Sequence, residues 1–349
     1  MIGILLVNLG TPEAPKTREV RRYLAEFLMD PRVLDIPTVA RMLLLHGIIL
    51  RTRPRKSAHA YQQVWDAERG SPLLFHSQDL ADALQQRMGQ RARVVLAMRY
   101  GQPDLDSALT RLQNEGCDRV VVVPLYPQYA SSSSGSTLER VYQLAAQRPV
   151  PPSLLAVRDF YDHPGFIDAQ VEVARQPLAD FNPDHVLISF HGVPERHVVA
   201  TDLHDGTHCL RSDSCCDEIG SANRACYRAQ CFATARGIAA GLGLEDGTWS
   251  VAFQSRLGRI PWIRPYTDER VVELAQQGTR RLAVMCPSFV ADCLETLEEI
   301  GIRAKEDFIE AGGEDLLRID CVNSHDRWVD GLQQIIDQAL RGQDAAAAR

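Results

Sequence analysis

Short apolar runs alternate with amphipathic stretches along the whole chain of 349 residues. The runs are rich in Val, Ile and Leu and do not alternate cleanly with polar residues, which is typical of strands buried on both faces of a parallel sheet. Eight runs are predicted to be strands: 2–8, 93–99, 119–125, 153–157, 185–190, 250–254, 281–286 and 316–322. Helices are predicted over 17–29, 58–69, 78–88, 105–114, 136–147, 166–179, 221–240, 268–276, 291–301 and 326–340. This order predicts right-handed βαβ units and doubly wound sheets.

Eight strands fit two four-stranded layers better than one wide sheet. We therefore predict an α/β chain with two similar domains, each a four-stranded parallel sheet flanked by helices. The segment 149–152 holds three prolines in four residues, which neither a helix nor a central strand can continue. The predicted domains are therefore 1–152 and 153–349, with the last helix expected to pack back on the first domain.

Composition excludes several classes of protein. Hydrophobic residues make up 45% and charged residues 24% of the chain, which is ordinary for a globular protein. The net charge of -7 gives no sign of a general nucleic-acid binder. No apolar run reaches the roughly 18 residues of a membrane-spanning helix, and the N-terminus lacks the features of a signal peptide. We expect a cytoplasmic location, where thiols stay reduced.

A histidine follows the fifth predicted strand, at the sheet edge where open α/β folds carry their chemistry. His191 stands before Gly192, which permits a sharp turn. An unperturbed histidine titrates near about pH 6.5, so His191 can accept a proton at neutral pH. A hydrogen-bonded histidine at a strand end is an equally good interpretation. No G-x-S-x-G motif occurs, which argues against a serine hydrolase.

Three carboxylates are spaced i, i+3 and i+7 in the predicted helix 291–301. Asp292, Glu295 and Glu299 would share one face of that helix. Carboxylates near a helix N-terminus are favourable in themselves. The functional alternative is an acidic row that binds a hard cation or passes protons. Glu298 lies off the row and is predicted to be solvated.

Five of the nine cysteines lie between Cys209 and Cys231, in a polar insert over 202–231. Their spacing is not that of a regular zinc finger, and a reducing compartment argues against disulfides. Our first prediction for these cysteines is an iron–sulfur cluster. A zinc site is the second alternative and unligated thiols are the third. The predicted ligands are Cys209, Cys216, Cys226 and Cys231, with Cys215 as an alternative.

The apolar segment 36–50 is followed by Arg51, Arg53, Arg55 and Lys56. An internal helix with a basic end is the simpler interpretation. An apolar patch beside basic side chains also suits shallow contact with an anionic membrane surface.

Eight segments along the chain carry a combined pattern: LLVNLGTP (5–12), FLMDPRV (27–33), GSPL (70–73), MRYG (98–101), PLYPQYASSSSGS (124–136), SFHGVP (189–194), FQSRLGRIPWIRPYTDE (253–269) and CPSFVADCLETLEEI (286–300). Together they resemble the ferrochelatases, which insert ferrous iron into a porphyrin to make haem. The resemblance covers nearly the whole chain, and its specific parts are the segment 253–269 and the pair of His-Gly and Leu-Glu-Thr-Leu motifs.

The resemblance implies a lyase of late haem synthesis, with two Rossmann-like, chelatase-type domains and protoporphyrin IX in the cleft between them. His191 matches the active-site histidine, which would take protons from the pyrrole nitrogens and contact the substrate iron. Glu295 matches the active-site glutamate, which would be a second contact for the iron. Glu299 matches the next acidic residue along the helix. Segment 36–56 matches the membrane-facing lip of the pocket, which implies peripheral association with the inner face of the cell membrane. The positions that line the porphyrin pocket match Asn8, Tyr61, Arg99, Tyr100 and Trp262.

Two features depart from the family pattern, namely the residue at position 293 and the cysteine-rich insert. Cys293 replaces a histidine that many members carry two residues before the glutamate. Some relatives bind a 2Fe–2S cluster, often through cysteines near the C-terminus. This chain has no cysteine beyond Cys321, so the resemblance implies an internal ligand set.

The implied partners are protoporphyrin IX, Fe²⁺ and a membrane surface, without nucleic acid, for a monomer or homodimer. A cobalt-type chelatase of the same fold and a non-catalytic haem-binding protein are the alternative functions.

Overall fold

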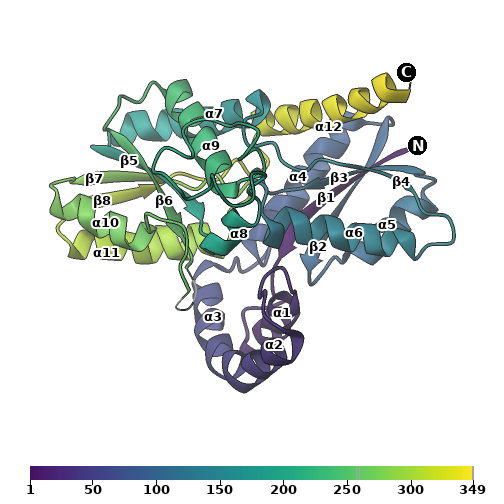
Figure 1. The fold of residues 1–349 in the computed structure, drawn as a ribbon, viewed down its shortest axis with the longest axis horizontal. Coiled ribbons are helices and arrows are strands. Elements are labelled where there is room, and N and C mark those ends of the chain that lie inside the picture. Colours follow the sequence, from purple (N-terminus) through teal and green to yellow (C-terminus); the bar gives the residue numbers. More distant parts are fainter. Residues whose placement is uncertain (257, 259, 348–349) are drawn as a thin grey trace. The chain divides into compact units, whose positions relative to one another are not determined.

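The computed structural model describes residues 1–256, 258 and 260–347. The chain divides into two compact units (Figure 1). Unit 1 comprises residues 1–126, 131–159 and those from 332 onward, and unit 2 comprises residues 127–130 and 160–331. Each unit holds one four-stranded parallel sheet.

The sheet of unit 1 has the strand order β2-β1-β3-β4. Side chains from Ile4 to Val7 of its inner strand β1 are fully buried, as expected where helices cover both faces of a parallel sheet. Its strands are β1 (Ile2–Gly10), β2 (Ala92–Tyr100), β3 (Arg119–Pro124) and β4 (Ser153–Ala156).

The helices of unit 1 include a helical excursion between β1 and β2, where α1 and α3 pack against each other. The predicted helix over 58–69 overlaps only the last turns of α3, which ends at Val64 and begins earlier than predicted because the apolar segment before it is also helical. The elements are α1 (Thr17–Met29), α2 (Thr38–Leu44), the π-helix η1 (Leu45–Ile49), α3 (Leu50–Val64), α4 (Pro72–Met88), α5 (Leu105–Asn114), the π-helix η2 (Ser131–Gly135) and α6 (Ser136–Ala146).

The sheet of unit 2 repeats this order as β6-β5-β7-β8. Its strands are β5 (His185–His191), β6 (Trp249–Gln254), β7 (Arg281–Met285) and β8 (Asp315–Arg318). The helices are α7 (Pro164–Phe181), α8 (Glu195–Val199), α9 (Tyr227–Leu242), α10 (Thr267–Gln276), the π-helix η3 (Glu295–Ala304) and α11 (Lys305–Glu310), and α12 (Asp326–Ala347) begins here.

The predicted fold class is confirmed, with strands close to all eight predicted positions. The proline segment 149–152 differs from its predicted role, because β4 follows it and pairs with β3. These prolines therefore lead into the last strand of the first sheet, and that sheet ends after Ala156.

Two predicted helices begin later than expected, over 221–240 and 291–301. The first begins at Tyr227, because the side chain of Asn223 donates to the carbonyls of Cys215 and Glu218 and fastens a turn there. None of the described helices combines the length and the hydropathy that crossing a bilayer requires.

Candidate active site

His191 ends β5 in unit 2, and three contacts fix it. Its backbone N–H donates to Ser288 Oγ at 2.9 Å, and its carbonyl accepts from the Tyr227 hydroxyl at 2.7 Å. Its ring Nδ1 lies 2.6 Å from the Gly192 carbonyl. A carbonyl can only accept, so Nδ1 carries the hydrogen and the neutral ring keeps a lone pair on Nε2. The described geometry therefore suits a proton acceptor.

Gly192 allows the next segment to pack closely beside this histidine. Its N–H donates to the Gln254 carbonyl at 2.8 Å. A Cβ at Gly192 would lie 2.9 Å from that oxygen and 3.2 Å from the Trp262 ring. The segment around Trp262 is held there because Ile263 donates to the Val193 carbonyl. Glycine thus brings the Trp262 ring against the turn that follows His191.

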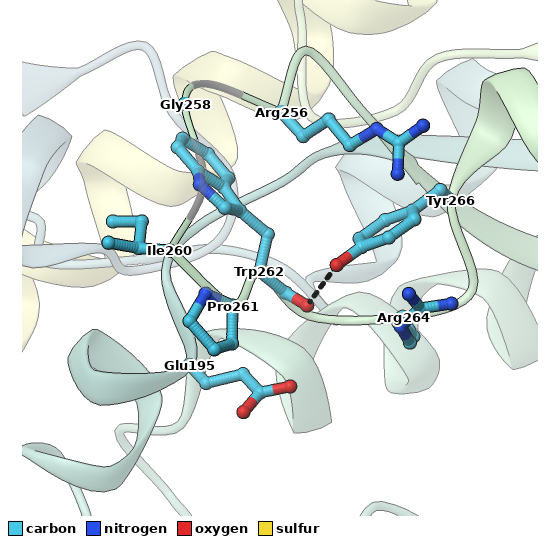
Figure 2. A pocket seen from close by; sticks show the side chains of 8 residues that line it. All are labelled: Glu195, Arg256, Gly258, Ile260, Pro261, Trp262, Arg264 and Tyr266. Atoms are coloured by element: carbon cyan, nitrogen blue, oxygen red, sulfur yellow. Dashed lines mark hydrogen bonds between the residues drawn. The ribbon is translucent and has the colours of Figure 1, made fainter.

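A cavity of about 450 Å³ in unit 2 is lined in part by Trp262 (Figure 2). Trp262 and Tyr266 provide its aromatic walls, and the Tyr266 hydroxyl donates to the Trp262 carbonyl at 3.2 Å. The guanidinium groups of Arg256 and Arg264 both stack on the Tyr266 ring, at 4.3 and 4.2 Å from its centre. This wall combines apolar surface with positive charge, although Glu269 pairs with both arginines.

Glu295 and Glu299 lie on η3, whose ten residues make it long for a π-helix. Asp292 precedes this helix, so the predicted row of three on one helix face is wrong. Thr296 Oγ1 donates to Asp292 and accepts from the Cys293 N–H, which replaces the expected first helical turn. Asp292 is buried and pairs with Arg318 at 2.7 Å, so its role is structural.

The Glu299 carboxyl group is held by neutral donors. Ser255 donates to it twice, from its N–H at 2.8 Å and from its hydroxyl at 2.5 Å. Gln254 Nε2 lies 3.5 Å from Glu299 and 2.9 Å from the Glu295 carbonyl. The pKa of Glu299 is raised overall, mainly by burial and also by the charge of Glu295. The Ser255 hydrogen bond and His191 oppose this rise. The Glu299 carboxyl group therefore lies within electrostatic reach of both Glu295 and His191.

Glu298 is buried rather than solvated as predicted. Both of its carboxyl oxygens accept from Arg303, at 2.9 to 3.0 Å. Long side chains on neighbouring turns allow this bidentate pair, which makes the burial of Glu298 tolerable.

The corresponding edge of unit 1 holds a closed hydrogen-bonded network. Asp30 accepts from Arg99 at 2.6 Å, from the Tyr100 hydroxyl at 2.8 Å and from Ser136 at 2.5 Å. Tyr100 is buried, and its ring packs edge-on against Phe27. The buried Asp30 carboxylate uses the Tyr100 hydroxyl as a donor. The predicted place of Tyr100 in the porphyrin pocket stays a prediction.

The other two predicted pocket residues of unit 1 are also largely buried. Asn8 donates to Ser77 Oγ at 3.0 Å, and the Tyr61 ring packs edge-on against Trp65. Their contact with a substrate stays a prediction.

The chain is similar to known proteins over nearly its whole length. The ferrochelatase family model matches residues 1–340. The chain is 47% identical over 338 residues to the ferrochelatase of Stutzerimonas stutzeri (strain A1501), covering 97% of this chain and 98% of that protein. It is 45% identical over 336 residues to the ferrochelatase of Legionella pneumophila (strain Lens), covering 96% of this chain and 98% of that protein. The chain belongs to the ferrochelatase family.

The family assignment confirms the predicted resemblance and the enzyme class, a lyase. Among solved structures, SirB from Bacillus subtilis with Fe³⁺ has a similar fold, with a TM-score of 0.53 and 10% identity over 99% of this chain and 97% of that one. This likeness supports the chelatase-like arrangement of strands and helices.

Cys293 stands where many ferrochelatases carry a histidine. Its thiol is buried beside Glu295, and burial followed by the Glu295 charge raises its pKa far above the usual range. The thiol is therefore neutral at physiological pH and can donate its hydrogen to that carboxylate.

The cysteine insert brings its thiols together in the hydrophobic core of unit 2. Cys226 forms side-chain hydrogen bonds with Cys209 and Cys216, and Cys215 Sγ lies 3.7 Å from Cys216 Sγ. Cys231 bonds instead to the Tyr227 hydroxyl. Burial raises the pKa of Cys209 to about 11. The soft, clustered donors fit a thiophilic metal or an iron–sulfur cluster.

This grouping of thiols does not have the geometry of a formed metal site. Over residues 1–256, 258 and 260–347, no three His, Cys, Asp or Glu side chains are arranged to hold a metal ion. The described thiols are free of disulfides.

Three residues of the site had no distinct sequence signal. Ser255, Tyr227 and Asp30 each hold a predicted site residue, yet each looks like an ordinary turn, helix or loop residue in the chain. Ser255 lies within the segment 253–269 that carries the resemblance, and this was the available clue.

Proposed function

We propose that this chain inserts ferrous iron into protoporphyrin IX to form protohaem. The observation that carries the proposal is the arrangement around His191: its hydrogen bond to Gly192 leaves the Nε2 lone pair available, and the nearby Glu299, which feels the charges of His191 and Glu295, is held by the neutral donors of Ser255. Relatives named ferrochelatase, at 47% and 45% identity, support the same reaction.

Metallation removes two pyrrole N–H protons while a divalent cation enters the ring. His191 Nε2 accepts a proton, and the Tyr227 and Ser288 hydrogen bonds keep the ring in position. Glu295 and Glu299 attract the cation or carry protons away, since hard cations prefer carboxylate oxygens. A bound Fe²⁺ contacts His191 and Glu295 in this proposal.

The Trp262 ring provides an apolar face for the flat macrocycle. Arg99, Asn8, Tyr61 and Tyr100 on unit 1 are further proposed substrate contacts, although the charge of Arg99 is already paired with Asp30. Tyr100 would act through Arg99, whose guanidinium lies 4.4 Å from its ring centre.

The test is anaerobic incubation with Fe²⁺ and protoporphyrin IX, followed by the loss of porphyrin fluorescence. Consumption of protoporphyrin with Fe²⁺, and little reaction of an earlier tetrapyrrole with Co²⁺, supports the proposal. The opposite preference would identify a cobalt-type chelatase. Haem binding without turnover would identify a haem-binding protein.

We also propose a 2Fe–2S cluster in the insert, held by Cys209, Cys216, Cys226 and Cys231. Cys215 Sγ lies 3.7 Å from Cys216 Sγ, so Cys215 is the alternative to its neighbour Cys216. Such a cluster would tie the insert to α9 and contribute to folding. A visible absorbance band with about two iron and two sulfide per chain supports it, whereas colourless protein with stoichiometric zinc supports the zinc alternative.

We further propose a cytoplasmic protein that associates peripherally with an anionic membrane through 36–56. Val39 and Leu43 on α2 are 71% and 70% exposed, an unusual concentration of apolar surface. The side chains of Arg51, Arg53, Arg55 and Lys56 are also exposed. Co-sedimentation with anionic vesicles should fall with added salt and with all four changed to Ser. A monomer or homodimer remains the prediction for the assembly.

A further inference from the structure

Ser255 has an uncommon backbone conformation at the end of β6. Its φ is 66°, in the left-handed region that residues other than glycine, asparagine and aspartate seldom adopt. This conformation aims both of its donors at one carboxyl group. The N–H bonds to Glu299 Oε1, and the hydroxyl bonds to Oε2. One residue therefore occupies both oxygens.

Among the residues that the structure describes, no other side chain holds Glu299 as firmly. The Gln254 amide is at 3.5 Å, the limit of a hydrogen bond. Arg303 is engaged in its bidentate pair with Glu298. Gln254 is itself fixed, because its Oε1 accepts from Ser189 at 2.8 Å. The orientation of the Glu299 carboxyl group thus depends mainly on Ser255.

We infer that Ser255 is a positioning residue, whose two donors hold the Glu299 carboxyl group in one orientation for cation or proton transfer. This inference rests on the function proposed above. A carboxyl group on a long side chain has several rotamers, and fixing it in advance removes a cost from the reaction. The strained backbone supports this role, since strain of this kind collects at functional sites.

The competing interpretation is that Ser255 only anchors the turn after β6 to η3. The two interpretations differ in what Ser255→Ala does once Glu299 is changed. A positioning residue acts through Glu299, so its removal has no further effect in the Glu299→Gln background. An anchor acts on the whole turn, so its removal has the same effect in both backgrounds.

The experiment measures kcat and the KM values for Fe²⁺ and protoporphyrin separately. We expect Ser255→Ala to lower kcat/KM for Fe²⁺ by roughly 10- to 100-fold, as for loss of a hydrogen bond to a charged group. The KM for protoporphyrin should stay within about twofold, and in the Glu299→Gln background the further loss should be under about twofold. Equal losses in the two backgrounds, or a loss confined to the KM for protoporphyrin, would overturn the inference.

Ser255→Gly keeps the N–H and favours the positive φ but lacks the hydroxyl. It should fold and match Ser255→Ala; wild-type activity would overturn the role of the hydroxyl. Ser107→Ala is the matched control, because that hydroxyl also donates to a carboxylate, Asp104 at 2.7 Å, at the start of α5. It should keep activity within about twofold. If wild-type protein consumes no protoporphyrin, the proposed function fails, whereas turnover without coupling to Glu299 rejects this inference alone.

Discussion

The two sheets have the same strand order, yet the carboxyl groups at their edges are in opposite states. In unit 1 the buried Asp30 is neutralised by Arg99. In unit 2 the half-buried Glu299 receives neutral donors from Ser255 and Gln254. A compensated carboxylate stabilises a fold, and an uncompensated one is available to a cation or a proton.

The pKa values of the two groups move in opposite directions. Burial raises the pKa of Asp30, but hydrogen bonds from Ser136, the Arg32 backbone and Tyr100, with the Arg99 charge, lower it overall. The pKa of Glu299 is raised, with burial as the main cause. The same scaffold therefore offers a structural carboxylate at one edge and a candidate chemical group at the other.

The largest expected effect is from His191→Ala. Loss of the proton acceptor should lower kcat by about 10²- to 10⁴-fold while protoporphyrin still binds. Stopped-assay turnover and porphyrin fluorescence titration measure the two quantities. Turnover within about tenfold of wild type would contradict the role of His191.

Glu295→Gln should be the next most damaging change, with a loss of roughly 10- to 100-fold in kcat/KM for Fe²⁺. Glu298 is an unsuitable control because it is paired with Arg303. Glu306→Gln, exposed on the following helix, is the matched control. Similar losses in kcat/KM for Glu295→Gln and Glu306→Gln would contradict a specific role for Glu295 in the site.

Asp30→Asn tests the other half of the comparison. Leaving Arg99 without its carboxylate should lower the free energy of unfolding by about 3 kcal/mol, as for a broken buried pair. Urea denaturation measures this loss, and the folded fraction should retain Fe²⁺ affinity. Unchanged stability would show that unit 1 does not depend on its compensated pair.

Tyr227→Phe should have a smaller effect, since it removes one hydrogen bond to the His191 carbonyl. We expect a loss of about 1 kcal/mol, or about fivefold, in kcat with an unchanged KM for protoporphyrin. A change in protoporphyrin binding alone would argue that Tyr227 does not act through His191.

The pH dependence of stability gives the finest test. The lowered pKa of Asp30 adds stability above the ordinary aspartate pKa, and this contribution disappears as pH falls. The raised pKa of Glu299 adds stability below the ordinary glutamate pKa, and this contribution disappears as pH rises through the raised value. Asn and Gln are neutral like a protonated carboxyl group, so Asp30→Asn should become less stable than wild type, and Glu299→Gln more stable, as pH rises from 3 to 8.

The sequence could predict both sheets because buried parallel strands leave continuous apolar runs, and His191 because it follows such a run. It could not predict that Asp292 leaves the acidic row, since side-chain bonds from Thr296 alter the helix start. Nor could it predict the pairing of Glu298, which depends on the conformation of η3. These features depend on local hydrogen bonds that periodicity does not encode.

The Tyr227 hydroxyl reaches His191 across 36 residues of chain. Most of those residues belong to the insert and form neither helix nor strand, so closing this loop costs conformational entropy that local structure does not offset. The strand that carries His191 can form early, but its last constraint must wait until the insert has closed and α9 has begun at Tyr227. Assembly of the site is thus a late folding event, and substitutions that slow closure of the insert would reduce the yield of competent enzyme without touching a residue of the reaction.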